Sequence, residues 1–226
     1  MTEYFIGVDL GQAQDPSTIA VVERVELCGE FDAAVWAYRK LVELRLRGLE
    51  RIPLGTPYRE VAERVAEVTR SPKLKGAVRL VIDATGVGRP MMELVRSARP
   101  EGRMKGVVVT AGHEQTMSGS YYCVPKQDLM MGLQLLFEGG GLRMARSLKE
   151  GPTLQRELVG LKQRISSIGR VQYGGGREGK HDDLVFAVAL AYWEIQQTYR
   201  RPDEYWQDKE EAERVLAFQK ARKWEE

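Results

Sequence analysis

Residues 3–11 have the sequence EYFIGVDLG, and this stretch decides the fold that we expect for the chain. Its interior is apolar and β-prone, and Asp9 follows that interior directly, with Gly11 closing the segment. Burying a carboxylate at the end of such a strand costs free energy unless the group is paired or binds a cation. An aspartate that caps a turn would give the same pattern, so Asp9 alone leaves both interpretations open.

A second segment, residues 77–88, repeats the arrangement with the sequence AVRLVIDATGVG. An apolar strand again runs into an acid, Asp83, before a glycine-containing turn. Ligands bind at the carboxyl ends of the strands in open α/β sheets, so Asp9 and Asp83 are expected at one such edge. The glycines do not complete the GxGxxG pattern of a dinucleotide-binding loop, which argues against nucleotide binding here.

The third acidic position precedes the most apolar helix expected in the chain, at residues 183–199. His181, Asp182 and Asp183 stand at its start, and one aspartate could simply cap the helix. Two adjacent acids and a histidine exceed what capping requires. We therefore assign Asp183 to a metal ion and His181 to a supporting role. Asp182 is a further candidate ligand or the capping residue, and the reverse assignment of the two aspartates stays open.

The order of the expected elements indicates an α/β protein with a central mixed β-sheet and helices on both faces. A hairpin of strands at 3–10 and 17–25 comes first, and residues 33–46, although ambiguous, favour a third strand. The elements expected after that are a helix at 57–70, a strand at 77–83, a helix at 89–98, a strand at 104–110, a polar loop at 111–124, helices at 125–138 and 148–161, two short strands within 163–173, a glycine-rich loop at 174–180 and the helix at 183–199. We expect one domain over residues 1–200 and a charged helical extension over 201–226.

Three carboxylates from separate segments suit hard cations such as Mg²⁺ or Mn²⁺. Two such ions can clamp a phosphodiester during in-line hydrolysis, so Asp9, Asp83 and Asp183 are the candidate catalytic and metal-binding residues. The net charge is only +2, but basic residues dominate between positions 139 and 181. Candidate DNA contacts are Lys126, Arg143, Arg164, Arg170, Arg177 and Lys180.

Other features exclude several classes of protein. No apolar run is long enough to span a membrane, and the N-terminus does not resemble a signal peptide. The two cysteines lie far apart, which favours a reducing, cytoplasmic setting, and two histidines are too few for a histidine-based zinc site. Residues 174–180, GGGREGK, match part of a Walker A motif, but His181 replaces the required Ser or Thr, so ATP binding is not favoured.

Taken together, these motifs resemble the nuclease domain of the phage large terminase subunit over residues 3–198. The motifs are GVDLG at 7–11 with DPS at 15–17, VIDATGVG at 81–88, VPK at 124–126, GLR at 141–143 and KHDDLV at 180–185. The resemblance implies an RNase H-like fold and a two-metal endonuclease that cuts viral DNA during packaging, with two Mg²⁺ or Mn²⁺ ions present when substrate is bound. It places Asp9, Asp83 and Asp183 at the metal, with Asp182 adjacent.

The resemblance also implies partners: double-stranded DNA, and a phage portal or packaging ATPase. A full terminase carries an ATPase motor before its nuclease, whereas this sequence begins at the first nuclease strand, so motor activity is not expected. Two alternatives remain. One is a RuvC-like Holliday junction resolvase, which would prefer four-way junctions. The other is a non-catalytic nucleotide-binding module of related fold, which would bind nucleotide but not DNA.

Overall fold

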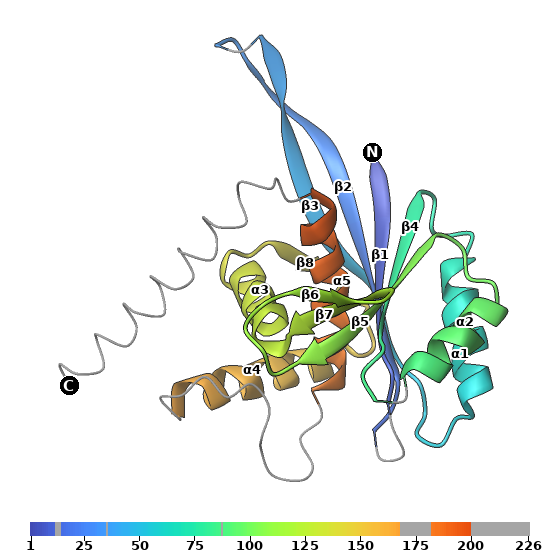
Figure 1. The fold of residues 1–226 in the computed structure, drawn as a ribbon. Coiled ribbons are helices and arrows are strands. Elements are labelled where there is room, and N and C mark those ends of the chain that lie inside the picture. Colours follow the sequence, from blue (N-terminus) through green and yellow to red (C-terminus); the bar gives the residue numbers. More distant parts are fainter. Residues whose placement is uncertain (12–14, 35, 87, 168–181, 200–226) are drawn as a thin grey trace.

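The computed structural model describes residues 1–11, 15–34, 36–86, 88–167 and 182–199. Within them, one mixed eight-stranded β-sheet runs through the molecule, with helices on both faces (Figure 1). The strand order is β6-β7-β5-β4-β1-β2-β3-β8. The strands are β1 (Thr2–Asp9), β2 (Thr18–Asp32), β3 (Ala37–Arg51), β4 (Ala77–Asp83), β5 (Arg103–Thr110), β6 (Thr116–Ser118), β7 (Tyr121–Pro125) and β8 (Leu142–Met144).

The centre of the sheet combines an antiparallel part with a parallel part. The strands β1, β2 and β3 form an antiparallel meander, whereas β4 pairs with β1, and β5 with β4, in parallel. Residues Tyr4–Val8 of β1 are all buried, as expected for a strand covered on both faces. The carboxyl ends of β1 and β4 therefore meet at one edge of the sheet.

Two layers of helices cover this sheet. The helices α1 (Tyr58–Thr69) and α2 (Gly88–Ser97) pack on the face that carries Tyr4, Ile6 and Val8. The helices α3 (Lys126–Glu138), α4 (Gly151–Ser167) and α5 (Asp183–Tyr199) lie on the other face (Figure 1). The helix α5 is buried on nearly every side because it lies between the sheet and the other two helices. None of the helices in the described ranges has the length and apolar character needed to cross a membrane.

The structure corrects two of the element predictions and confirms an ambiguous one. Residues 111–124 are not simply a loop, because they contain β6 and most of β7. Strand β7 contains tyrosine and valine residues, which favour strands. Its parallel pairing with β5 stabilises it through a contact between distant segments. Residues 163–167, expected as part of a short strand, continue α4, and the rest of that prediction lies outside the described residues. The ambiguous segment 33–46 does contribute a strand, β3.

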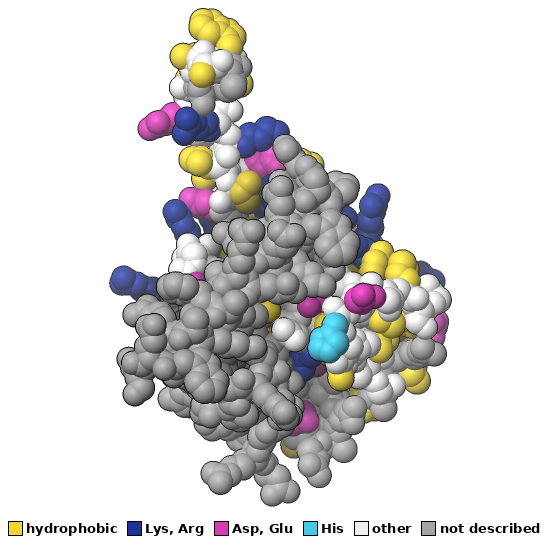
Figure 2. Space-filling view, turned by 60° about the vertical axis from the view of Figure 1, so that its left-hand side comes forward, with side chains coloured by type: hydrophobic (Ala, Val, Ile, Leu, Met, Phe, Trp, Pro, Cys, Tyr) yellow, Lys and Arg dark blue, Asp and Glu magenta, His cyan; other side chains and the backbone are white. Residues whose placement is uncertain are grey.

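The hairpin formed by β2 and β3 projects beyond the body of the sheet (Figure 1). Its pairing with β1 ends at Val25, and residues further out pair only across the hairpin. Hydrophobic side chains gather at its tip (Figure 2). There the ring of Phe31 contacts the rings of Trp36 and Tyr38, and all three side chains are exposed. The predicted extension over 201–226 lies outside the described residues.

Candidate active site

Asp9 and Asp83 occupy equivalent positions at the ends of two neighbouring parallel strands. Val8 of β1 pairs with Ile82 of β4, and each aspartate is the next residue along its strand. Both side chains lie on the α5 face, because residues two positions earlier, Gly7 and Val81, contribute to that face. The register of one β-ladder therefore brings these two carboxylates together.

The first turn of α5 lies over the same edge of the sheet. Gly7 permits this approach, since a Cβ atom at that position would lie 2.0 Å from the carbonyl oxygen of Ala187 in α5. Thr18, which pairs with Asp9 across β1 and β2, donates its hydroxyl to the carbonyl oxygen of Asp183 at 2.9 Å. These contacts fix the start of α5, and with it Asp183, beside the last residue of β1 and the first residue of β2.

Hydrogen bonds hold the carboxylate of Asp83 in one orientation. Its Oδ1 atom accepts the Thr85 backbone N–H at 2.8 Å and the Thr85 hydroxyl at 2.5 Å. The same hydroxyl accepts the Val109 backbone N–H from β5 at 2.9 Å. The threonine after the acid thus ties Asp83 to the neighbouring strand, a function that the sequence pattern did not suggest.

The four aspartates at this edge act on one another electrostatically. Burial raises the pKa of Asp9 well above its ordinary value, and the negative charges of Asp83, Asp183 and Asp182 raise it further. Burial also raises the pKa of Asp83, against the effect of its hydrogen bonds to Thr85. The charge of Lys126, the first residue of α3, opposes both shifts, and its Nζ atom lies 3.7 Å from Asp182 Oδ2.

A metal ion would fit the chemistry of this edge. Carboxylate oxygens are the ligands that Mg²⁺ and Mn²⁺ prefer, and an added cation would relieve the repulsion that raises the pKa of Asp9. In the conformation described, however, no three His, Cys, Asp or Glu side chains within the described ranges lie close enough together to hold one ion jointly. The edge therefore brings carboxylate oxygens of the kind that such an ion binds to one part of the sheet.

Two residues that the sequence did not identify as functional hold the start of α5. Glu157 of α4 accepts the backbone N–H groups of Leu184 and Val185 at 3.1 and 3.3 Å. Its other oxygen accepts a hydrogen bond of 2.6 Å from Arg51, whose guanidinium lies 4.0 Å from Asp183 Oδ2. Burial raises the pKa of Glu157, and the Val185 N–H and the positive charge of Arg51 oppose that shift.

The other predicted contacts with DNA are only partly described. The structure places Lys126 among the aspartates and Arg143 on β8, where it forms an ion pair of 2.9 Å with Glu43. Strand β8 pairs with Leu44–Leu46, away from the end of β3 at Arg51 that adjoins Asp183. Arg164 belongs to α4, but its side chain lies outside the described part of the molecule, as do all of Arg170, Arg177, Lys180 and His181.

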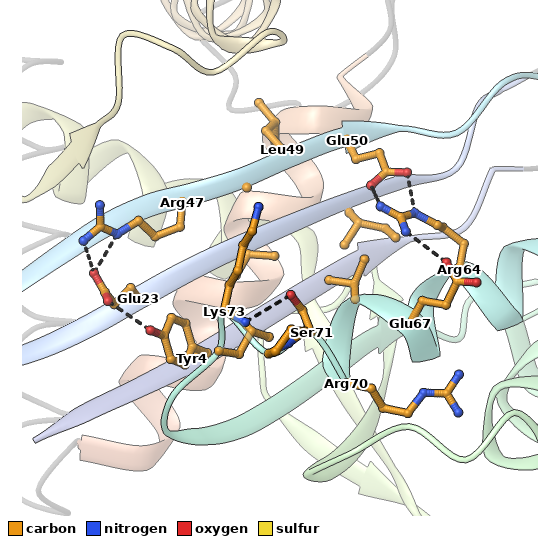
Figure 3. A pocket seen from close by; sticks show the side chains of 16 residues that line it. Tyr4, Glu23, Arg47, Leu49, Glu50, Arg64, Glu67, Arg70, Ser71 and Lys73 are labelled. Atoms are coloured by element: carbon orange, nitrogen blue, oxygen red, sulfur yellow. Dashed lines mark hydrogen bonds and ion pairs between the residues drawn. The ribbon is translucent and has the colours of Figure 1, made fainter.

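A pocket of about 750 Å³ lies on the other face of the sheet, between β3, α1 and the segment before β4 (Figure 3). Tyr4 at the start of β1 lines it, so it lies away from the strand ends that carry the aspartates. Several of its charged groups are paired with one another: Glu23 binds Arg47 and Tyr4, and Arg64 binds Glu50 and Glu67 (Figure 3). This pocket and the acidic edge, the edge of the sheet that carries Asp9, Asp83, Asp182 and Asp183, are therefore separate features.

Comparison with known proteins was informative at the level of structure only. No family model matches the chain, and no curated protein matches it in sequence. The Mn-soaked, inhibitor-bound human cytomegalovirus terminase nuclease domain superposes with a TM-score of 0.50 at 15% identity, over 85% of this chain and 82% of that one. The chain has the fold of a terminase nuclease domain.

The expected RNase H-like fold is thereby confirmed. Two further solved structures are also similar to the chain. The Mn-soaked cytomegalovirus nuclease domain has a TM-score of 0.49 at 15% identity, covering 84% of this chain and 81% of that one. The large terminase nuclease domain of bacteriophage SPP1 with bound Mn has a TM-score of 0.45 at 11% identity, covering 85% of this chain and 86% of that one. At these identities the likeness concerns the fold and not the site.

Proposed function

We propose that the chain is a metal-dependent DNA endonuclease that cuts duplex DNA by two-metal-ion phosphodiester hydrolysis. The observation that carries this proposal is the convergence of Asp9, Asp83, Asp182 and Asp183, whose charges act together on Asp9 at one edge of the sheet. Two of these four carboxylates face a cation in the described residues, since Lys126 lies 3.7 Å from Asp182 and Arg51 lies 4.0 Å from Asp183, and a bound metal ion would balance negative charge that remains beside Asp9. The Mn-soaked cytomegalovirus nuclease domain with the same fold supports a divalent cation here.

In this proposal Asp9, Asp83 and Asp183 hold the metal, and Asp182 assists beside Lys126. When bound, divalent cations would activate a water molecule and stabilise the leaving oxygen of the phosphodiester. Because Thr85 engages Oδ1 of Asp83, Oδ2 is the atom of that residue that we assign to the metal. Asp9, flanked by the other three acids, lies at the centre of the arrangement.

Lys126 contributes a fixed positive charge at the same edge. Its ammonium group lies 3.7 Å from Asp182 and 5.6 Å from the centre of the Phe186 ring, so α3 and α5 both position it. A cation there would limit the repulsion among the carboxylates and attract a DNA phosphate. We further propose that the protein partners are components of viral DNA packaging, a portal or a packaging ATPase.

Plasmid cleavage in Mg²⁺, Mn²⁺, Ca²⁺ and EDTA tests the proposal. Wild type should nick plasmid in Mg²⁺ or Mn²⁺ and not in EDTA, and Asp83→Ala should reduce nicking to the EDTA level while the protein stays folded. Glu67→Gln, which removes an acid from the pocket face, is the matched control and should cleave normally. Undiminished cleavage by Asp83→Ala would refute the assignment.

The choice of substrate separates the proposal from its alternatives. Linear duplex, plasmid and a four-way junction should be compared at equal concentration in the same metal. A strong preference for the junction would indicate a RuvC-like resolvase, and nucleotide binding without DNA binding would indicate a non-catalytic module. Comparable cleavage of plasmid and linear duplex is the result we expect.

A further inference from the structure

The first turn of α5 is capped by a side chain from a different helix. Backbone N–H groups in the first turn of a helix have no partner within that helix, and a nearby residue of the same segment usually accepts them. Here Glu157 of α4 accepts those of Leu184 and Val185 with a single oxygen, Oε2. Its negative charge also lies at the positive end of the α5 dipole, which favours the contact.

The second oxygen of Glu157 connects this cap to the sheet. Arg51, the last residue of β3, donates Nη2 to Oε1 at 2.6 Å, and the same nitrogen lies 4.0 Å from Asp183 Oδ2. Arg51 also pairs in register with Thr18, whose hydroxyl binds the carbonyl oxygen of Asp183. The first turn of α5 is thus contacted by residues of α4, β3 and β2, and Asp183 itself by Arg51 of β3 and Thr18 of β2.

We propose that Glu157 and Arg51 are positioning residues for the metal site: they hold the first turn of α5 so that Asp183 can bind the ion. This inference rests on the proposed nuclease function. Glu157 does not serve as a ligand itself, because both of its oxygens are engaged and its side chain is only 7% exposed. Its effect on the metal passes through Asp183, and Arg51 orients both carboxylates.

Metal affinity measured without DNA tests this role directly. Isothermal titration of Mn²⁺ into Glu157→Gln should show an affinity about 10- to 100-fold below that of wild type, as is usual when a partner of a metal ligand is lost. Glu50→Gln is the matched control. Glu50 precedes Arg51 in β3 and forms a comparable ion pair, but with Arg64 on the opposite face (Figure 3). Its Mn²⁺ affinity should equal that of wild type.

A double-mutant cycle separates positioning from general damage to the fold. In an Asp183→Asn background, Glu157→Gln should weaken Mn²⁺ binding by less than about threefold, because the residue through which it acts no longer binds the ion. An equal weakening in both backgrounds would show that Glu157 acts by general stability alone and would overturn the proposal. Melting curves confirm that each variant is folded before titration.

Arg51→Lys provides a second measurement should Glu157→Gln fail to fold. Lysine keeps the charge but cannot bridge two carboxylates with a planar guanidinium, so Mn²⁺ affinity should again fall while Glu50→Gln remains normal. If wild type binds Mn²⁺ and neither variant weakens it, the positioning role is wrong and the proposed function stands. If wild type itself binds no Mn²⁺, the proposed function and this inference fail together.

Discussion

Asp9 is the aspartate of the acidic edge whose ionised form is opposed both by burial and by the negative charges of the other three. Its folded-state pKa is raised by burial and by three neighbouring aspartates, so ionisation of this group opposes folding. The stability that protonated Asp9 provides is present at low pH and is lost as the pH rises through its folded pKa. At neutral pH and without metal, this carboxyl group therefore destabilises the folded protein relative to the unfolded chain, in which it ionises without these penalties.

Asp9→Asn should relieve this destabilisation. We expect it to stabilise the metal-free protein by about 0.5–2 kcal/mol at neutral pH, as when a strained functional group is removed. Each kcal/mol corresponds to roughly 2–4 °C in melting temperature for a chain of this size. The difference from wild type should shrink as the pH falls toward about 4, where aspartate is protonated in the unfolded chain as well.

The same variant should lose the response to metal. Saturating Mn²⁺ should raise the melting temperature of wild type and leave that of Asp9→Asn nearly unchanged, which differential scanning fluorimetry can measure across pH. Asp128→Asn, a substitution in the first turn of α3 where the acid bonds Gln115, serves as control and should respond like wild type. A lower melting temperature for metal-free Asp9→Asn at neutral pH would contradict the argument.

Residues of the site differ in how far the sequence could reveal them. Asp9 and Asp83 were predictable, because each follows its own apolar strand and the parallel register brings them together. The contact between Glu157 and Arg51 was not predictable, because it joins two residues that lie 106 positions apart in the sequence. Periodicity and motif spacing carry no signal for such a contact.

At the scale of elements, the close approach of α5 to β1 determines whether the site can form. Gly7 lies against the α5 backbone, and a Cβ atom there would come within 2.0 Å of Ala187 O and 2.7 Å of Ala191 N. Helix backbone cannot give way locally, so a side chain at position 7 would displace α5 as a whole. Asp183 would move with it, away from Asp9.

Gly7→Ala should therefore reduce stability and metal affinity together. Overpacking of a core typically costs about 1–3 kcal/mol, which corresponds to a fall in melting temperature of several degrees. Mn²⁺ affinity should drop even at temperatures where the variant is fully folded. Gly48→Ala is a useful comparison, because a Cβ there would meet only the side chain of Val21, at 3.2 Å, and no backbone atom. Normal stability in Gly7→Ala would show that α5 adapts without cost.

The elements themselves were largely predictable, with failures where tertiary pairing overrides local composition. The strands β1 and β4 and the helix α5 have continuous apolar sequences, and the structure has them where expected. The strand β7 was missed because polar and glycine residues surround it, and its pairing with β5 stabilises it. Three-residue strands such as β6 and β8 are too short for an alternating pattern to emerge.

At the scale of the molecule, the hairpin and the acidic edge lie at opposite ends of the central sheet. Asp9 pairs with Thr18 at the start of β2, whereas Thr2 pairs with Val25, and the hairpin continues outward from there. Its outer part is a two-stranded ribbon whose aromatic tip is exposed, with Trp36 81% exposed. Such a ribbon has little stability of its own and contributes little to the core.

Removing the outer hairpin should therefore leave both fold and site intact. Replacing residues 27–41 by an Asn-Gly turn joins Glu26 to Val42, which already face each other across the ribbon. We expect the melting temperature to stay within roughly 2–4 °C of wild type, equivalent to about 1 kcal/mol. Mn²⁺ affinity should not change, because none of the four aspartates contacts the deleted residues through the strand pairing. A folded, metal-binding variant that no longer cuts plasmid would instead show that DNA reaches across the whole sheet to the hairpin, and that the substrate surface is far larger than the acidic edge.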